Sequence, residues 1–100
     1  MEVTVNGKHF ELTEPIHDYA VEKANKLPKF YDRVHQVDIL IDKTDSHTFG
    51  CEFIAHVEGA DHFVANGKNA DLYAAIDETS GKIERQLHKY KEIKRNHKHH

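Results

Sequence analysis

Apolar and polar residues alternate in four stretches of the chain, which is the period of a β-strand with one buried face. The expected strands span residues 2–6, 35–42, 49–58 and 62–65. In HQVDILID, the apolar face carries Val37, Ile39 and Ile41. In FGCEFIAHVE the alternation is equally regular, with Ile54 as the one apolar residue on the polar face. Gly7 is expected to break the first strand, with residues 8–12 forming a turn or a ragged continuation, and NGKNAD is expected to follow the fourth strand as a second breaker.

Two segments instead repeat apolar residues every three or four positions, as amphipathic helices do. The first is expected from Glu14 to Leu27, after Thr13 as N-cap, with Pro15 in the first turn and Pro28 ending it. The second is expected from Asp71 to Arg95, capped by Asn69 or Asp71. Its apolar stripe is about 80° wide and consists of Leu72, Ile76, Thr79, Ile83, Leu87 and Tyr90. At 1.5 Å per residue this helix is roughly 37 Å long, so its last turns should project beyond the core.

The predicted order is β-α-β-β-β-α, an α+β fold. Three consecutive strands joined by short turns form an antiparallel meander, and the first strand must pair with one of them. Two amphipathic helices can cover one face of this four-stranded sheet, which leaves the other face open to water. One hundred residues fit a single domain, expected at residues 1–95, with a flexible basic and histidine-containing tail at 96–100.

Composition indicates a soluble globular protein, with 38% hydrophobic and 31% charged residues. No apolar run approaches the roughly 20 residues of a membrane helix, and MEVTVNGKHF has no signal-peptide pattern. Cys51 is the only cysteine, so no internal disulfide can form. These features favour a reducing, cytoplasmic location without a membrane partner.

Positive charge is concentrated at one end of an acidic protein. The formal net charge is -3, yet residues 82–100 hold seven basic and two acidic residues, a net of +5. A second basic segment, KANKLPKFYDR, spans residues 23–33. Such segregation predicts one positive face for a polyanion. The competing interpretation is a solvated helix surface, with cations favoured by the helix dipole at its C-terminus.

The candidate RNA-binding residues come from both basic segments. On the last helix, Lys82, Arg85 and Lys89 share a flank about 60° wide. His88 and Tyr90 add stacking groups, although Tyr90 belongs to the apolar stripe. If the helices pack side by side, the two segments form a single positive channel. The full set is Lys23, Lys26, Lys29, Arg33, Lys82, Arg85, Lys89, Lys91, Lys94 and Arg95.

The stretch DLYAAIDETSGKIERQLHKYKEIKR, which follows HVEGADHFVANGKNA, resembles the ribosome hibernation-promoting factor family, which includes ribosome-associated inhibitor A. The opening VTVNGKHFELTEPIHDYAVEKANKL and FYDRV resemble that family as well, so the resemblance covers essentially the whole chain. Pro28 is a departure, where a charged helix-former is expected. It leaves open how far the first helix extends and where Lys29 points.

The resemblance implies a fold similar to the double-stranded RNA-binding domain. It also implies binding to small-subunit rRNA and ribosomal proteins in the mRNA and tRNA channel, which silences translation under stress or in stationary phase. The family's basic positions match Lys82, Arg85, Lys89 and Lys91, with Lys23 and Lys26 on the first helix. The chain looks like the short form, whose relatives favour paired ribosomes, and we expect it to be monomeric when free.

Other functions have weaker support. Ten histidines are scattered without the spacing of a metal site, so no metal or other cofactor is expected. The carboxylates Asp38, Asp42, Glu52 and Glu58 share the predicted open face, but no nucleophile–base set accompanies them, so neither an enzyme nor a small-molecule substrate is expected. Cys51 alternates with core residues and is expected to be buried. The alternative function is a general nucleic-acid-binding or protein-interaction module that modulates transcription.

Overall fold

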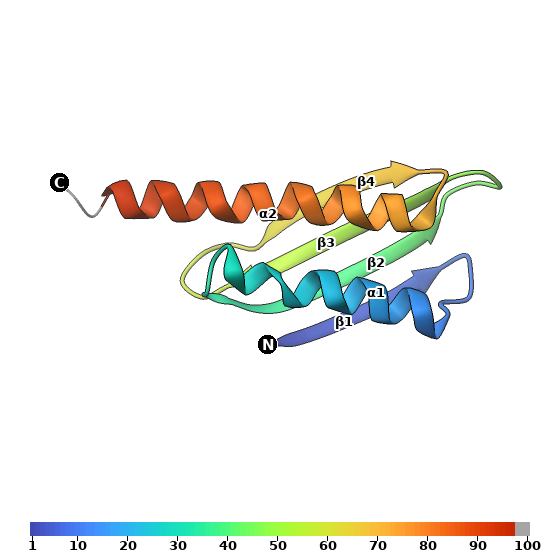
Figure 1. Cartoon of the computed structure of the whole chain (residues 1–100), viewed down its shortest axis with the longest axis horizontal. Coiled ribbons are helices and arrows are strands. Elements are labelled where there is room, and N and C mark those ends of the chain that lie inside the picture. The colour runs from blue at the N-terminus through green and yellow to red at the C-terminus, as the bar shows by residue number, and fades with distance from the viewer. Residues whose placement is uncertain (98–100) are drawn as a thin grey trace.

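A four-stranded sheet with two helices across one face makes up the protein, seen in a computed structural model that describes residues 1–97 (Figure 1). The predicted element order and the α+β class are confirmed. The elements are β1 (Glu2–Lys8), α1 (Glu14–Asn25), the 3₁₀ turn η1 (Leu27–Lys29), β2 (Val34–Lys43), β3 (Phe49–Val57), β4 (Phe63–Asn69) and α2 (Leu72–His97).

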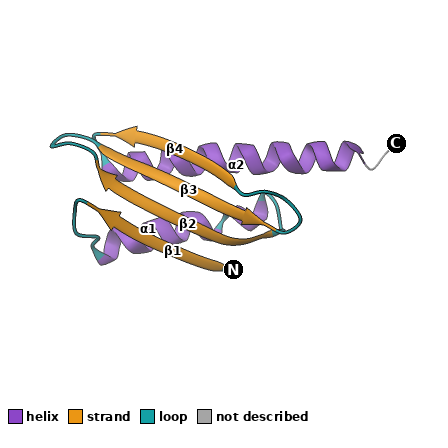
Figure 2. Ribbon diagram, turned by 180° about the vertical axis from the view of Figure 1, so that it is seen from behind, coloured by secondary structure: helices purple, strands orange, loops and turns teal. Residues whose placement is uncertain are grey.

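The strands lie in the order β1-β2-β3-β4. The first pair is parallel, with Val5 opposite Ile39, because α1 carries the chain back across the sheet between them. The remaining pairs are antiparallel and form the predicted meander. Figure 2, seen from behind, shows that neither helix covers the opposite face of the sheet.

The first helix ends earlier than its sequence pattern predicts. Thr13 precedes it in an extended conformation, as an N-cap residue does, but its side chain makes no capping hydrogen bond. The helix stops at Asn25 rather than Leu27, because Pro28 disfavours helical backbone in the residue before it. Leu27 instead begins η1 and is fully buried. The chain thus turns sharply while it keeps a leucine in the core.

The second helix is capped by acidic and amide side chains. The Tyr73 amide donates to Asp71 Oδ1 at 3.0 Å, and the Asp71 amide donates to Asn69 Oδ1 at 2.9 Å. Its predicted apolar stripe is buried, with Tyr90 half-buried at the end. Its last turns extend beyond the sheet (Figure 1), so the molecule is elongated, with extents of 52 × 22 × 18 Å. The predicted tail at 96–100 lies partly in this helix, and residues 98–100 lie outside the described part.

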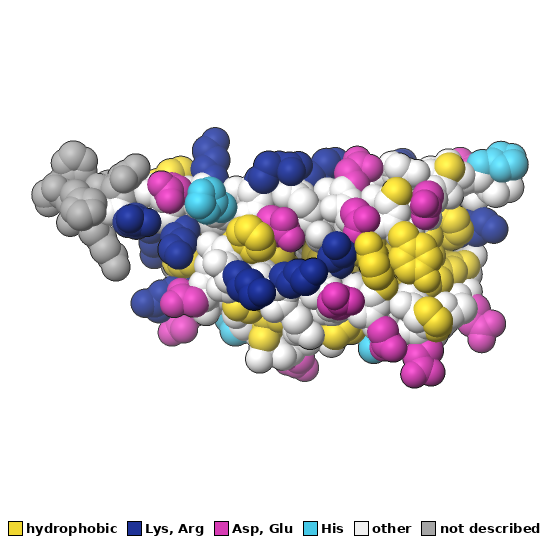
Figure 3. Space-filling view, in the orientation of Figure 1, with side chains coloured by type: hydrophobic (Ala, Val, Ile, Leu, Met, Phe, Trp, Pro, Cys, Tyr) yellow, Lys and Arg dark blue, Asp and Glu magenta, His cyan; other side chains and the backbone are white. Residues whose placement is uncertain are grey.

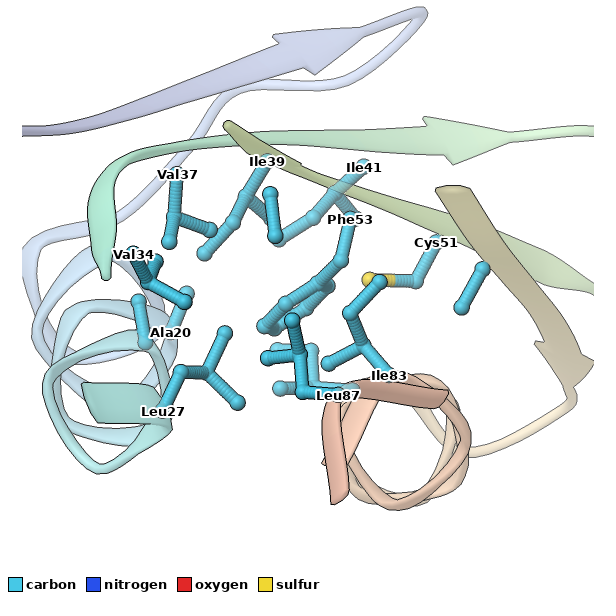
Figure 4. Close-up of a cluster of buried hydrophobic side chains, with 14 of the residues drawn as sticks. Ala20, Leu27, Val34, Val37, Ile39, Ile41, Cys51, Phe53, Ile83 and Leu87 are labelled. Atoms are coloured by element: carbon cyan, nitrogen blue, oxygen red, sulfur yellow. The ribbon is translucent and has the colours of Figure 1, made fainter. Parts of the chain in front are cut away.

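Side chains from the sheet, from α1 with η1, and from α2 meet between the sheet and the helices (Figure 4). Ile39 and Phe53 project from the sheet toward Leu27 beside α1 and toward Ile83 and Leu87 on α2. All five are at most 1% exposed. Burial of one such side chain stabilises the fold by roughly 1.5–3 kcal/mol relative to its exposure. This core fixes both helices on the same face of the sheet.

Two glycines expected to interrupt strands lie inside them. Gly7 pairs with Ile41, so β1 runs on to Lys8, and Gly67 pairs with Cys51, so β4 runs on to Asn69. The predictions of a strand ending at residue 6 and of a break at NGKNAD are therefore wrong. At Gly67 the reason is packing, because a Cβ there would lie 2.5 Å from Thr79 Oγ1 on α2. The glycine lets the helix lie close to the strand.

No helix within residues 1–97 is both long enough and apolar enough to cross a membrane.

Candidate nucleic-acid interface

Lys and Arg side chains gather over both helices on the covered side of the sheet. Figure 3 shows them over the middle and left of this face, while Asp and Glu side chains are more frequent on its right. The two basic segments found in the sequence therefore share one face. The individual cations differ in whether their charge is already paired.

Lys23 links the two helices. Its Nζ lies 3.2 Å from Asp77 Oδ1 on α2 and 5.3 Å from the centre of the Tyr19 ring. The Tyr19 hydroxyl donates to the same carboxylate at 2.5 Å. That hydrogen bond, together with the pairing to Lys23, holds the pKa of Asp77 below its usual range, and the bond to Asp77 raises the pKa of Lys23. The charge of Lys23 is thus largely used within the protein.

Lys82 is also engaged within the protein. Its Nζ donates to the carbonyl oxygen of Asn66 at 2.7 Å and lies 3.5 Å from a carboxylate oxygen of Glu78. Gln86 donates to the carbonyl oxygen of Val64 at 3.0 Å. These two side chains of α2 satisfy carbonyls on the outer edge of β4, which protects an edge strand against pairing with another chain.

Lys26 is loosely paired. Its Nζ lies 3.9 Å from a carboxylate oxygen of Glu22, one helical turn earlier, and both side chains are well exposed. Pairs of this kind contribute about 0.3–0.5 kcal/mol. An approaching phosphate can therefore displace Glu22 with little loss, and Lys26 stays a candidate.

The other seven predicted cations lie free on the surface. Among residues 1–97 no carboxylate lies within the 4.0 Å of an ion pair from any of them. Lys94 contacts an aromatic ring instead, because its Nζ lies 5.6 Å from the centre of the Tyr90 ring. All seven are exposed, and they are Lys29, Arg33, Arg85, Lys89, Lys91, Lys94 and Arg95. A phosphate that binds at these positions therefore has no ion pair to break.

Four of the free cations line one hollow. It has a volume of 750 Å³ and lies between the projecting end of α2, the segment after η1 and the β3–β4 turn. Its basic lining residues are Arg33, Lys91, Lys94 and Arg95, and Asp32 and Glu58 are its acidic ones. Positive charge exceeds negative charge by two in this hollow, which suits an anion.

Arg85 lines a second hollow of 340 Å³, between η1 and α2. The other residues around it are Phe30, Gly81, Glu84 and His88. Phe30 and Gly81 were not candidates from sequence, because neither belongs to a charge pattern and only the fold brings them together. Tyr90 packs against Tyr31 and Phe63, with ring centres 5.5 and 5.1 Å away, so it belongs to the core rather than to a stacking surface.

Two carboxylates of the open face, Asp38 and Asp42, are bound to neighbouring side chains. Asp38 accepts hydrogen bonds from Thr4 at 2.7 Å and Gln36 at 3.0 Å, and its other oxygen lies 2.8 Å from His56 Nε2. Partial burial raises the pKa of Asp38, but these bonds outweigh it, so the pKa lies below its usual value. Within residues 1–97, no group of three His, Cys, Asp or Glu side chains could hold a metal ion.

Comparison with known proteins identifies the family. The sequence profile described as "Sigma 54 modulation protein / S30EA ribosomal protein" matches residues 3–95. The chain belongs to this family. The resemblance inferred from the sequence motifs is thereby confirmed.

Two relatives of similar length have the same name. A "Ribosome hibernation promoting factor" from Pseudomonas putida is 35% identical over 92 residues, which is 92% of this chain and 88% of the relative. A protein of the same name from Escherichia coli K12 is 34% identical, over 97% of this chain and the whole of the relative. The S30EA family match therefore extends along nearly the full chain.

Solved structures share the fold. A ribosomal subunit interface protein from Coxiella burnetii superposes with a TM-score of 0.82 at 19% identity, over 91% of this chain and 98% of that one. The N-terminal domain of Thermus thermophilus Protein Y gives a TM-score of 0.81 at 24% identity, over 90% and 99%. The arrangement of helices and sheet is thus shared with proteins of quite different sequence.

Proposed function

We propose that this S30EA-family chain is a ribosome hibernation factor that binds small-subunit rRNA in the channel otherwise used by mRNA and tRNA. The observation that carries the proposal is the set of seven exposed, unpaired cations on α2, on η1 and in the segment that follows η1. The relatives named as ribosome hibernation promoting factors support it. The family consists of ribosome-associated factors rather than enzymes.

The proposed mechanism is electrostatic docking followed by steric occlusion. Arg guanidinium groups bind phosphate oxygens in a bidentate manner, and Lys ammonium groups act as point charges. The elongated α2 carries such groups from Arg85 to Arg95, and η1 adds Lys29. The body of the domain would then block tRNA and mRNA. We propose that the protein acts in the cytoplasm and is a monomer when free. The ribosomes that it binds, whether single or paired, are then inactive.

The structure changes which residues should be tested. Lys23 and Lys82 hold the fold through Asp77 and Asn66, so their replacement would alter stability as well as binding. The informative variant replaces Arg85, Lys89 and Lys91 together with Glu. A matched control replaces Lys8, Lys43 and Lys68 with Glu, since these are exposed lysines of the strands.

The experiment is co-sedimentation with purified small ribosomal subunits across a salt series, with duplex DNA as competitor. We expect saturable binding that duplex DNA does not displace. For each tenfold rise in salt concentration, the logarithm of the binding constant should fall by about 0.7–0.9 per phosphate contact. The α2 variant should lose this binding and stay folded, and the strand variant should retain it. Equal binding by both variants would refute the proposed interface. Equal competition by DNA would favour a general nucleic-acid-binding module instead.

A further inference from the structure

Gly81 lies in the middle of α2, where the fold gives no reason for a glycine. Its backbone is helical and its φ is not positive. A Cβ at this position would meet only Arg85 Nη1, at the ordinary contact distance of 3.5 Å. Gly67 differs, since a Cβ there would collide with Thr79. Glycine inside a helix lowers stability relative to alanine, so Gly81 reduces stability for a reason outside packing.

The empty space beside Gly81 is the 340 Å³ hollow between η1 and α2. Gly81, Glu84, Arg85 and His88 are spaced three and four residues apart, so they form one side of it. Phe30 forms the other side and is half-buried against the core. Its amide donates to the Leu27 carbonyl at 2.9 Å, so the η1 turn fixes the backbone of Phe30 facing α2. The hollow is open to solvent, so a flat group can enter it from the surface.

The chemistry of the lining fits a nucleobase. An aromatic ring offers a stacking surface to any base, and a guanidinium plane can cover the base from another side. Glu84 has no ion-pair partner among the residues of the described chain, so its carboxylate is free to accept a hydrogen bond. Carboxylates accept from an exocyclic amino group such as that of cytosine. Figure 3 shows apolar side chains exposed among the Lys and Arg side chains of this face.

We propose that this groove holds one unpaired rRNA base that bears an amino group, stacked on Phe30, with Glu84 accepting from that amino group. The inference rests on the proposed function, because it places the base in the rRNA that the surrounding cations bind. Free cations on both sides of the groove, Lys29 on η1 and Lys89 on α2, suit the flanking phosphates. Gly81 is then the residue that leaves room for the base.

Substitution at Gly81 separates stability from binding. Gly81→Ala should raise the melting temperature by roughly 2–8 °C and weaken small-subunit binding roughly fivefold or more, since the methyl group occupies the groove. Phe30→Leu should weaken binding similarly. Phe10→Leu is its control, because Phe10 is also half-buried but packs edge-on against Phe49 at the start of β3, and it does not line the groove. Unchanged binding by Gly81→Ala would overturn the inference.

A second experiment tests the base without the ribosome. NMR spectra of the whole protein are recorded with cytidine monophosphate, uridine monophosphate or ribose 5-phosphate. We expect cytidine monophosphate to shift the Gly81 amide and the Phe30 ring, uridine monophosphate to do so less, and ribose 5-phosphate not to do so. Equal shifts with all three would show a phosphate site and overturn the inference.

The outcomes distinguish the two proposals. If the protein does not bind small subunits, the proposed function fails, and the base-dependent shifts still test the groove. If subunits bind and Gly81→Ala weakens binding without any base-dependent shift, a protein side chain enters the groove and the base assignment is wrong.

Discussion

The ammonium group of Lys82 lies 2.7 Å from the carbonyl oxygen of Asn66, so a side chain of α2 closes the outer edge of β4. In the sequence Lys82 looks like one more cation on a basic helix. In the fold it performs the task that a further strand would perform, because it satisfies a backbone acceptor at the edge of the sheet. The same contact ties the helix to the strand that it covers.

Lys82→Ala should lower the free energy of unfolding by roughly 0.5–1.5 kcal/mol, because the Asn66 carbonyl loses its charged donor. Lys89→Ala is the control, since Lys89 is exposed and has no ion-pair partner within the described chain. Denaturant unfolding measures both. If the two variants unfold at the same denaturant concentration, the contact to Asn66 does not stabilise the protein.

Gly67→Ala should lower the free energy of unfolding by about 1–3 kcal/mol, because the new methyl group must displace Thr79. The Thr79 hydroxyl cannot move freely, since it donates to the Ala75 carbonyl at 2.7 Å. The double variant Gly67→Ala with Thr79→Ala should therefore be destabilised by less than the sum of the two single variants. Additive effects in thermal unfolding would contradict this contact.

Asp77→Asn should make the free energy of unfolding less dependent on pH in the acidic range. The pKa of Asp77 is lowered in the folded protein, chiefly by the hydrogen bond from Tyr19 and by Lys23. Its stabilisation is thus fully present above the unfolded pKa near 4 and lost as the pH falls through the lower, folded value. The variant should be less stable by roughly 0.5–1 kcal/mol at pH 7, and this difference should disappear toward pH 2.

Unfolding measured across that pH range tests this expectation, with Asp61→Asn as control, because Asp61 is exposed and makes no hydrogen bond or ion pair within residues 1–97.

A second loss of wild-type stability is expected above about pH 10. The pKa of Lys23 is raised by Asp77, so its stabilisation is present below the unfolded pKa and lost as the pH rises through the folded one. A constant difference between wild type and Asp77→Asn at every pH would rule out this coupling.

The Cys51 thiol should react with thiol reagents only after the protein opens. The side chain is 4% exposed, and its burial raises the pKa to about 12. At pH 8 the thiolate fraction is then on the order of a thousandfold below that of an ordinary cysteine. Labelling of native protein at pH 8 should be slow, and one equivalent should react in denaturant. Rapid labelling of native protein would mean that β3 opens readily.

Sequence patterns predicted the sheet and both helices because their periods report which side of each element is buried. Val37, Ile39 and Ile41 alternate along β2, and all three are at most 1% exposed. The stripe from Leu72 to Leu87 on α2 is buried as its spacing predicts. The patterns failed at Gly7 and Gly67, because glycine is typical of turns. Gly7 instead lies inside a strand, and Gly67 lets α2 lie close to β4. Local preference cannot reveal such a neighbour.

The sequence by itself determined the fold class, the family and the presence of a basic helix face, because periodicity, motifs and charge are written along the chain. Only the tertiary structure decided which cations are free. Lys23 is bound to Asp77, 54 positions away in the printed sequence, and Lys82 is bound to a backbone carbonyl that no sequence pattern marks. Whether a charge faces solvent or a partner depends on contacts between distant segments, and folding creates these contacts.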